Sequence, residues 1–194
     1  MSALATVRYR QLLDAAAIQV DLPQWVYRGQ AYRGGEWLEG LILAESAGNP
    51  KARRYEPHQD RAGRTDARSD ADRPGQDDGD LEDDASYGLM QVMGYNARAL
   101  VGVDIGTPMR FGWLLLPIVN IALGLRILTA ELRAVASEIA LARARPHQLV
   151  ERALCRYNGG PTGDALVRGD LRLRAYVDRI ASHASDVQRD RGRA

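Results

Sequence analysis

The chain has 194 residues, of which 45% are apolar, and a formal net charge of +1. This length suits one domain with a real core, and the balanced charge gives no indication of a nucleic-acid partner. Cys155 is the only cysteine, which excludes an intrachain disulfide and leaves either a reducing or an oxidising compartment open.

We predict neither a signal peptide nor a membrane-spanning helix. Charged residues interrupt the apolar residues of 1–20, so this segment has no apolar h-region. The most apolar run, 111–125, contains Pro117 and Asn120 and is too short to span a bilayer. It is predicted to be a buried core helix.

Residues 4–20 are predicted to form a first helix, and 24–35 a partly buried loop. A second helix is expected from near Glu36 to Gly48. In it, Glu45 continues an apolar stripe that includes Leu38 and Leu41, at the spacing of one helix face. Because burying an ionised carboxylate is costly, we expect a raised pKa and a proton held near neutral pH, as a general acid requires. The alternative is a glutamate at the helix end that reaches solvent.

Between Asp66 and Asp84 the sequence has nine acidic residues against two arginines. The segment 59–84 is therefore predicted to be an exposed, acidic, flexible insertion. A cation-binding loop is the alternative, although the acids lack the regular spacing of a calcium loop.

Downstream, residues 85–93 are expected to be extended or to form a tight turn, and 106–108 a turn. Further helices are predicted over 95–100, from 116 or 117 to 135, and over 136–144, 146–156 and 170–185, followed by a polar, frayed tail from Asp186. The fold class is therefore mainly α, with at most one small β-hairpin near the insertion.

Three short segments combine polar side chains with glycine or proline at the end of an apolar element. They are Glu45-Ser46-x-x-Asn49-Pro50, Tyr87-Gly88-Leu89-Met90-Gln91 and Cys155-Arg156-Tyr157-Asn158-Gly159-Gly160. In this order they resemble the catalytic domain of the lytic transglycosylases related to goose-type lysozyme, the SLT family. The helix 120–128 is similar to a fourth family segment, and 54–58 is similar to a segment of a phage-associated branch. Arg156 and Ile127 depart from the family pattern, which has alanine and tyrosine there.

The resemblance implies a lysozyme-like α+β fold over 36–185, with 1–35 packed on it as an N-terminal helix and loop and 186–194 as a polar tail. It also implies cleavage of the β-1,4 bond between N-acetylmuramic acid and N-acetylglucosamine. Glu45 would protonate the glycosidic oxygen and then take the proton of the C6 hydroxyl, which closes a 1,6-anhydro ring. Retaining glycosidases usually need two carboxylates, whereas this reaction needs one.

Substrate contacts are implied for the residues of the three segments, with Tyr157 also orienting Glu45. They are Ser46, Gly88, Met90, Gln91, Tyr157 and Asn158. Glu56 is either a second acid or a surface glutamate paired with Arg53 or Arg54. A second acid would allow the alternative activity, a hydrolytic goose-type muramidase, and a non-catalytic cell-wall-binding module is a further alternative.

No metal or cofactor is expected, because His58, His147 and His183 share no ligand spacing. The expected partner is the peptidoglycan glycan strand, bound by a monomer. Action in the periplasm or cell wall without a signal peptide suggests a phage virion or endolysin protein, export by a dedicated route, or a fragment of a longer chain.

Overall fold

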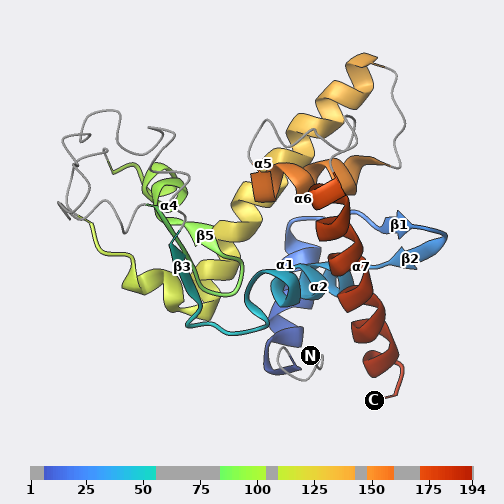
Figure 1. The fold of residues 1–194 in the computed structure, drawn as a ribbon, viewed down its shortest axis with the longest axis horizontal. Helices are drawn as coiled ribbons and strands as arrows, with labels where there is room; N and C mark the ends of the chain where they lie inside the picture. Colours follow the sequence, from blue (N-terminus) through green and yellow to red (C-terminus); the bar gives the residue numbers. More distant parts are fainter. Residues whose placement is uncertain (1–6, 56–83, 104–108, 143–147, 160–170, 194) are drawn as a thin grey trace. The chain divides into compact units, whose positions relative to one another are not determined.

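A computed structural model describes residues 7–55, 84–103, 109–142, 148–159 and 171–193 (Figure 1). The described residues are mainly helical, with two small antiparallel sheets, which confirms the predicted mainly-α class. The chain divides into two compact units. The first contains 1–47 and 125–194, and the second contains 48–124.

The first unit is built from helices around one short hairpin. After a 3-10 turn at Val7–Tyr9, its elements are α1 (Arg10–Gln19), β1 (Trp25–Tyr27), β2 (Gln30–Tyr32), α2 (Gly34–Ser46), the later part of α5 (Pro117–Ala142), α6 (Leu149–Gly159) and α7 (Leu171–Arg191). The second helix therefore begins close to the predicted position.

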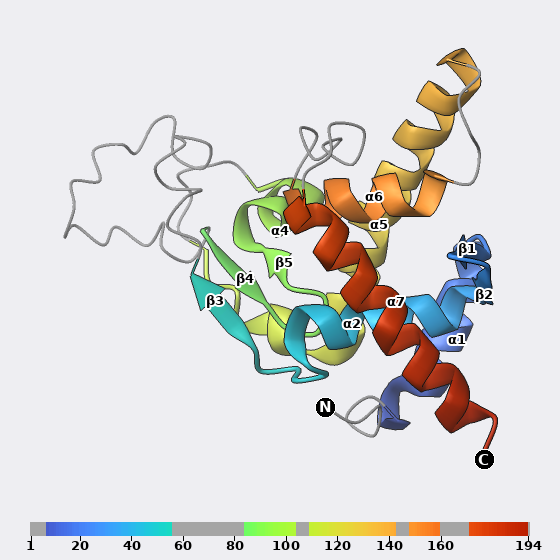
Figure 2. The same ribbon diagram turned by 45° about the vertical axis from the view of Figure 1, so that its right-hand side comes forward.

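Helix α2 forms the core of the first unit, and α1 and α7 pack against it (Figure 2). Its apolar side chains are almost completely buried, including Trp37, Leu38 and Leu41. At Gly40 helices α2 and α7 approach closely, because a Cβ placed there would lie 2.8 Å from the carbonyl oxygen of Ile180 and 2.9 Å from the amide nitrogen of Ala184. This glycine therefore permits the close packing of α2 on α7.

Residues 25–32 form an antiparallel hairpin, so the predicted loop over 24–35 is wrong. The turn residues Arg28 and Gly29 both have positive φ, 49° and 82°, as the tightest hairpin turns require. An arginine at such a position gives no turn signal, which is why the hairpin was not predicted. Trp25 pairs with Tyr32, and both side chains are buried.

The other two differences concern helix length. Helix α5 is continuous from Pro117 to Ala142, where two helices were predicted. Helix α7 continues to Arg191, so 186–191 are helical and not a frayed tail. The Arg191 guanidinium donates to Asp14 at 2.8 and 2.9 Å and to Glu39 at 2.9 Å. These bonds hold the C-terminal end of α7 against α1 and α2. The polar composition of 186–191 had indicated a frayed tail.

Glu39 joins the three packed helices of the first unit. Its carboxylate is fully buried and also accepts a hydrogen bond from Arg10 on α1 at 3.1 Å. Asp190 on α7 accepts a further hydrogen bond from Arg10, from its Nη2 atom, at 2.5 Å. A buried carboxylate is tolerated when it is paired in this way.

The second unit contains a three-stranded antiparallel sheet, in the order β3 (Arg53–Tyr55), β4 (Ala85–Tyr87), β5 (Val92–Met93). Helix α4 (Gly94–Val101), a 3-10 helix (Gly112–Leu115) and the first residues of α5 complete it. Strands β3 and β4 flank the acidic insertion. Residues 56–83 and the predicted turn at 106–108 lie outside the described residues. No described helix has the length and apolar character needed to cross a membrane.

Candidate functional site

Glu45 lies in the last turn of α2, at the end of the buried apolar stripe, and its side chain is half-buried. The hydroxyl group of Tyr176, on α7, donates a hydrogen bond to Glu45 Oε1. Tyr176 is itself buried, with 4% of its surface exposed. This hydrogen bond orients the Glu45 carboxylate, although Tyr176 lies 131 residues further along the chain.

Tyr157, in the last turn of α6, also lies close to Glu45. Burial, and then the charge of Glu45, raises the pKa of Tyr157 well above 10. The same two causes, together with the hydrogen bond to Glu45, raise the pKa of Tyr176 well above 10. Both phenols therefore keep their protons at neutral pH, and both are hydrogen-bond donors near the carboxylate.

Ser46 follows Glu45 as the last residue of α2 and is 9% exposed. Its hydroxyl donates to the carbonyl oxygen of Ile42 at 3.1 Å, inside the same helix. Ala47, in the left-handed conformation with φ of 56°, ends the helix. Glu45 therefore lies two residues before Ala47, where the chain leaves the helix.

Asn158 is exposed beside Tyr157, at the end of α6. Arg156, where the SLT pattern has alanine, is 8% exposed, and its guanidinium donates to both carboxylate oxygens of Glu138 on α5 at 2.8 Å. Arg152 binds the same carboxylate at 2.7 Å. The departure at Arg156 is therefore explained by an ion-pair cluster between α5 and α6.

The Gly88–Gln91 turn belongs to the second unit, where Asn120 holds it in place. Asn120 is fully buried; its Oδ1 accepts from the backbone N–H of Met90, and its Nδ2 donates to the carbonyl oxygen of Tyr87, both at 2.7 Å. Gly88 has φ of 72°, and a Cβ there would lie 2.5 Å from Asn120 Nδ2. Glycine is therefore required by both backbone conformation and space.

Met90 and Gln91 are buried within the same unit. Met90 is completely buried, and a Cβ at Gly124 would lie 2.6 Å from its sulfur. Gln91, 8% exposed, donates from Nε2 to the carbonyl oxygen of Gly88 at 2.9 Å and accepts from Ser86 at 2.8 Å. Gln91 therefore stabilises the turn, and Met90 packs against α5 at Gly124. The predicted substrate contacts of both residues stay predictions.

The first unit thus brings Glu45, Ser46 and Tyr157 together at the ends of α2 and α6, and the second unit builds the turn 88–91. Glu56, His58 and His147 lie outside the described residues, as do 59–83 of the insertion. Among the residues that the structure describes, no group of histidine, cysteine and carboxylate side chains could hold a metal ion.

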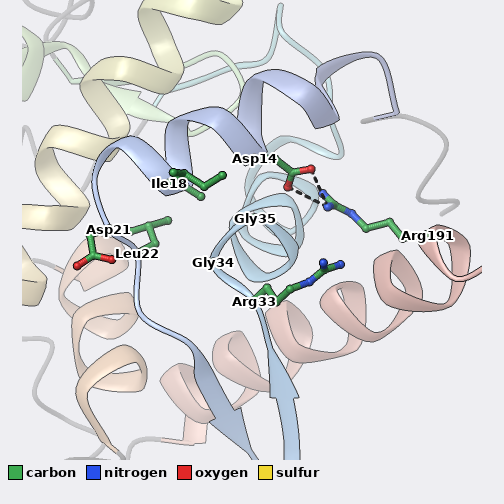
Figure 3. A pocket seen from close by; sticks show the side chains of 9 residues that line it. Asp14, Ile18, Asp21, Leu22, Arg33, Gly34, Gly35 and Arg191 are labelled. Carbon is green, nitrogen blue, oxygen red and sulfur yellow. Dashed lines mark hydrogen bonds and ion pairs between the residues drawn. The ribbon is translucent and has the colours of Figure 1, made fainter.

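A cavity of about 410 Å³ lies at the opposite end of α2 (Figure 3). Asp14, Arg33, Gly34, Gly35 and Arg191 are among its lining residues. Its charged groups are largely paired, because Arg191 binds Asp14 and Arg33 binds Glu36 at 2.6 Å. Gly34 precedes Glu45 by eleven helical positions, or roughly 16 Å along the axis, so this cavity is separate from the Glu45 carboxylate.

Tyr176 is the site residue that sequence reasoning missed. It lies within the last predicted helix, 170–185, and its spacing on that helix is that of an ordinary core tyrosine. No local signal could connect it with Glu45, because the contact exists only once α7 packs on α2.

Comparison with known protein families, with curated proteins and with solved structures found no match to this chain.

Proposed function

We propose that the protein is a peptidoglycan lytic transglycosylase. It would cleave the β-1,4 bond between N-acetylmuramic acid and N-acetylglucosamine and leave a 1,6-anhydro end, with Glu45 as the only acid and base. The observation that carries the proposal is the half-buried Glu45 carboxylate, oriented by the Tyr176 hydroxyl and flanked by Tyr157. The motif resemblance supports the same assignment independently of this contact.

The reaction has two proton transfers at one carboxyl group. Glu45 first donates its proton to the glycosidic oxygen as the bond to C1 of the muramic sugar breaks. The resulting carboxylate then takes the proton of the C6 hydroxyl, whose oxygen attacks C1 and closes the ring. The nucleophile belongs to the substrate, so positioning replaces the activation of a water molecule. The raised pKa of Glu45 stays a prediction.

The two tyrosines have distinct proposed tasks. Tyr176 restrains rotation of the carboxyl group and stabilises the carboxylate that forms after the first transfer, because its phenol donates to Oε1. Tyr157 supplies a second neutral donor beside Glu45. Because burial raises the pKa of both phenols, neither competes with Glu45 as the acid.

The remaining predicted residues are proposed to contact the sugars and peptide. Ser46 and Asn158 stand at helix ends of the first unit, where a polar group can meet a ligand. Gly88, Met90 and Gln91 belong to the turn that Asn120 holds rigid, and a rigid backbone turn suits recognition of acetamido and hydroxyl groups. The substrate lies outside the cytoplasmic membrane, and we propose delivery by a phage or by a dedicated export route.

The test is digestion of purified sacculi, with mass analysis of the released muropeptides. Products with 1,6-anhydro ends from the wild type, and none from Glu45→Gln, are expected. Products with reducing ends would assign the protein as a hydrolytic muramidase instead. Cleavage by Glu45→Gln at the wild-type rate would refute the site, and retained binding without any release would indicate a non-catalytic cell-wall-binding module.

A further inference from the structure

Side-chain hydrogen bonds join the β1–β2 hairpin to α7 at several points. In the first half of α7, the carboxylate of Asp178 accepts from the Tyr27 hydroxyl at 2.7 Å and binds Arg28 at 2.8 Å. Seven residues further along the helix, the hydroxyl groups of Ser185 and Tyr32 are hydrogen-bonded at 2.9 Å. The hairpin therefore holds α7 at two separate positions.

Gln188 adds a third contact, near the end of α7. Its Oε1 accepts from Gln30 at 2.8 Å, and its Nε2 donates to the carbonyl oxygen of Ala31 at 2.8 Å. The same Nε2 donates to Glu36 in the first turn of α2 at 2.6 Å. From Asp178 to Gln188 the contacts span roughly 15 Å of the helix axis. A single hydrogen bond leaves a helix free to turn about its axis, whereas contacts spread over this length resist that rotation.

The hairpin and Glu45 hold opposite sides of α7. Successive residues of a helix are turned by about 100°, so Asp178 lies about 160° around α7 from Tyr176, and Ser185 about 180° from it. Tyr176 donates to Glu45 on the other side. A rotation of α7 by about 10° would move a group about 6 Å from its axis by about 1 Å. Such a shift is enough to break the hydrogen bond between the phenol and Glu45.

The contact of Asp178 with Tyr27 is the nearest of these to the candidate site along α7, because Asp178 follows Tyr176 by two residues. Burial, and then the hydrogen bond to Asp178, raises the pKa of Tyr27, so its hydroxyl stays a donor at neutral pH. The ion pair of Asp178 with Arg28 is largely exposed, and exposed ion pairs contribute little by themselves. We therefore assign the restraint at Asp178 mainly to Tyr27.

We propose that the β1–β2 hairpin is a positioning element for catalysis, which fixes the rotation of α7 through Asp178 and so keeps the Tyr176 hydroxyl on Glu45. This inference rests on the proposed function. It adds Tyr27 and Asp178 to that function as positioning residues that act through Tyr176. Both lie outside the sequence motifs.

The first measurement is the rate of anhydro-muropeptide release from sacculi. Asp178→Ala removes both hairpin contacts of this aspartate, and release is expected to fall about threefold to tenfold. Asp178→Asn keeps an acceptor oxygen for Tyr27 and should retain a rate close to that of the wild type. The matched control is Asp186→Ala, which removes an aspartate whose ion pair with Arg189 lies within α7. The rate of this control should be unchanged.

A double-mutant cycle tests whether the effect passes through the phenol. In a Tyr176→Phe background, Asp178→Ala should cause no further loss of rate, because the hydrogen bond that it would disturb is already absent. A loss of general stability would instead add to the effect of Tyr176→Phe.

Fluorine NMR reports on the phenol without turnover. In protein labelled with fluorotyrosine, the resonance of Tyr176 is identified by its absence from Tyr176→Phe. This resonance is expected to move in Asp178→Ala and to stay in place in Asp186→Ala. Circular dichroism confirms that each variant is folded, and Tyr27→Phe takes the place of Asp178→Ala if the latter is not.

Three results would overturn the inference. These are equal release by Asp178→Ala and the Asp186→Ala control, a further loss in the Tyr176→Phe background, and a rate for Asp178→Asn as low as that of Asp178→Ala. The two proposals fail separately. Anhydro products from the wild type, with a Tyr176 resonance that ignores Asp178, would remove only this inference. A resonance that responds to Asp178 without any products would remove the proposed function and leave the link between the hairpin and the phenol.

Discussion

Replacing Gly40 by alanine tests the packing that brings Tyr176 to Glu45. The added Cβ would lie 2.8 and 2.9 Å from backbone atoms of α7. Backbone atoms cannot rotate away as a flexible side chain can, so α2 and α7 must separate by roughly 0.6 Å to restore ordinary contact. Overpacking of this kind costs about 1–3 kcal/mol.

Alanine also has a higher helix propensity than glycine, by about 1 kcal/mol, which offsets part of that cost. We expect a net loss of up to about 2 kcal/mol in the free energy of unfolding, or up to roughly 8 °C in Tm for a chain of this size. Urea unfolding followed by circular dichroism measures it. The matched control is Gly159→Ala, also helical, where the nearest atom of the described residues to a new Cβ is 4.0 Å away. Without a clash, its stability should rise by up to about 1 kcal/mol from helix propensity.

Catalysis provides a second measurement on the same variant. Tyr176 lies on α7, one turn before Ile180, so separation of the helices displaces its hydroxyl from Glu45. Sub-ångström misplacement of a catalytic group lowers the rate, and we expect a loss of about threefold to tenfold in anhydro-muropeptide release. A Gly40→Ala protein at least as stable as the Gly159→Ala control would refute the packing argument. Lowered stability with an unchanged rate would refute the link between the helix crossing and the site.

Three further predictions concern single contacts. Tyr176→Phe removes the hydrogen bond to Glu45 and should slow sacculus digestion about 10- to 100-fold with little change in Tm; unchanged turnover would exclude Tyr176 from the site. Asn120→Ala leaves two buried backbone groups of the 88–91 turn unsatisfied and should lower the free energy of unfolding by about 2–4 kcal/mol, measured by urea unfolding; a loss below about 0.5 kcal/mol would contradict it. For Glu36, burial raises the pKa, but hydrogen bonds outweigh this effect and lower it below 4.5. Its ionised form therefore stabilises the fold above that pH, so the stability difference between wild type and Glu36→Gln should shrink as pH falls below 4.5. A difference that stays constant down to pH 3 would contradict this reasoning.

Much of the helical framework was predictable because its signals are local. The apolar stripe with Leu38 and Leu41 predicted the helix that forms the core, and the helix predicted over 95–100 corresponds to α4, Gly94–Val101. The same stripe singled out Glu45 as a carboxylate in unusual surroundings. Where a local signal was missing or misleading the predictions failed, as at the Arg28-Gly29 turn and the polar end of α7.

The sequence by itself determined the mainly-α class, the position of Glu45 at a helix end and the motif order that suggests its chemistry. Only the tertiary structure decided which groups surround that carboxylate. Tyr176 reaches Glu45 because Gly40 permits α7 to lie close to α2, and Arg191 fixes the far end of α7 through Asp14 and Glu39. These contacts join residues more than a hundred positions apart, and no periodicity within one helix encodes such a pairing.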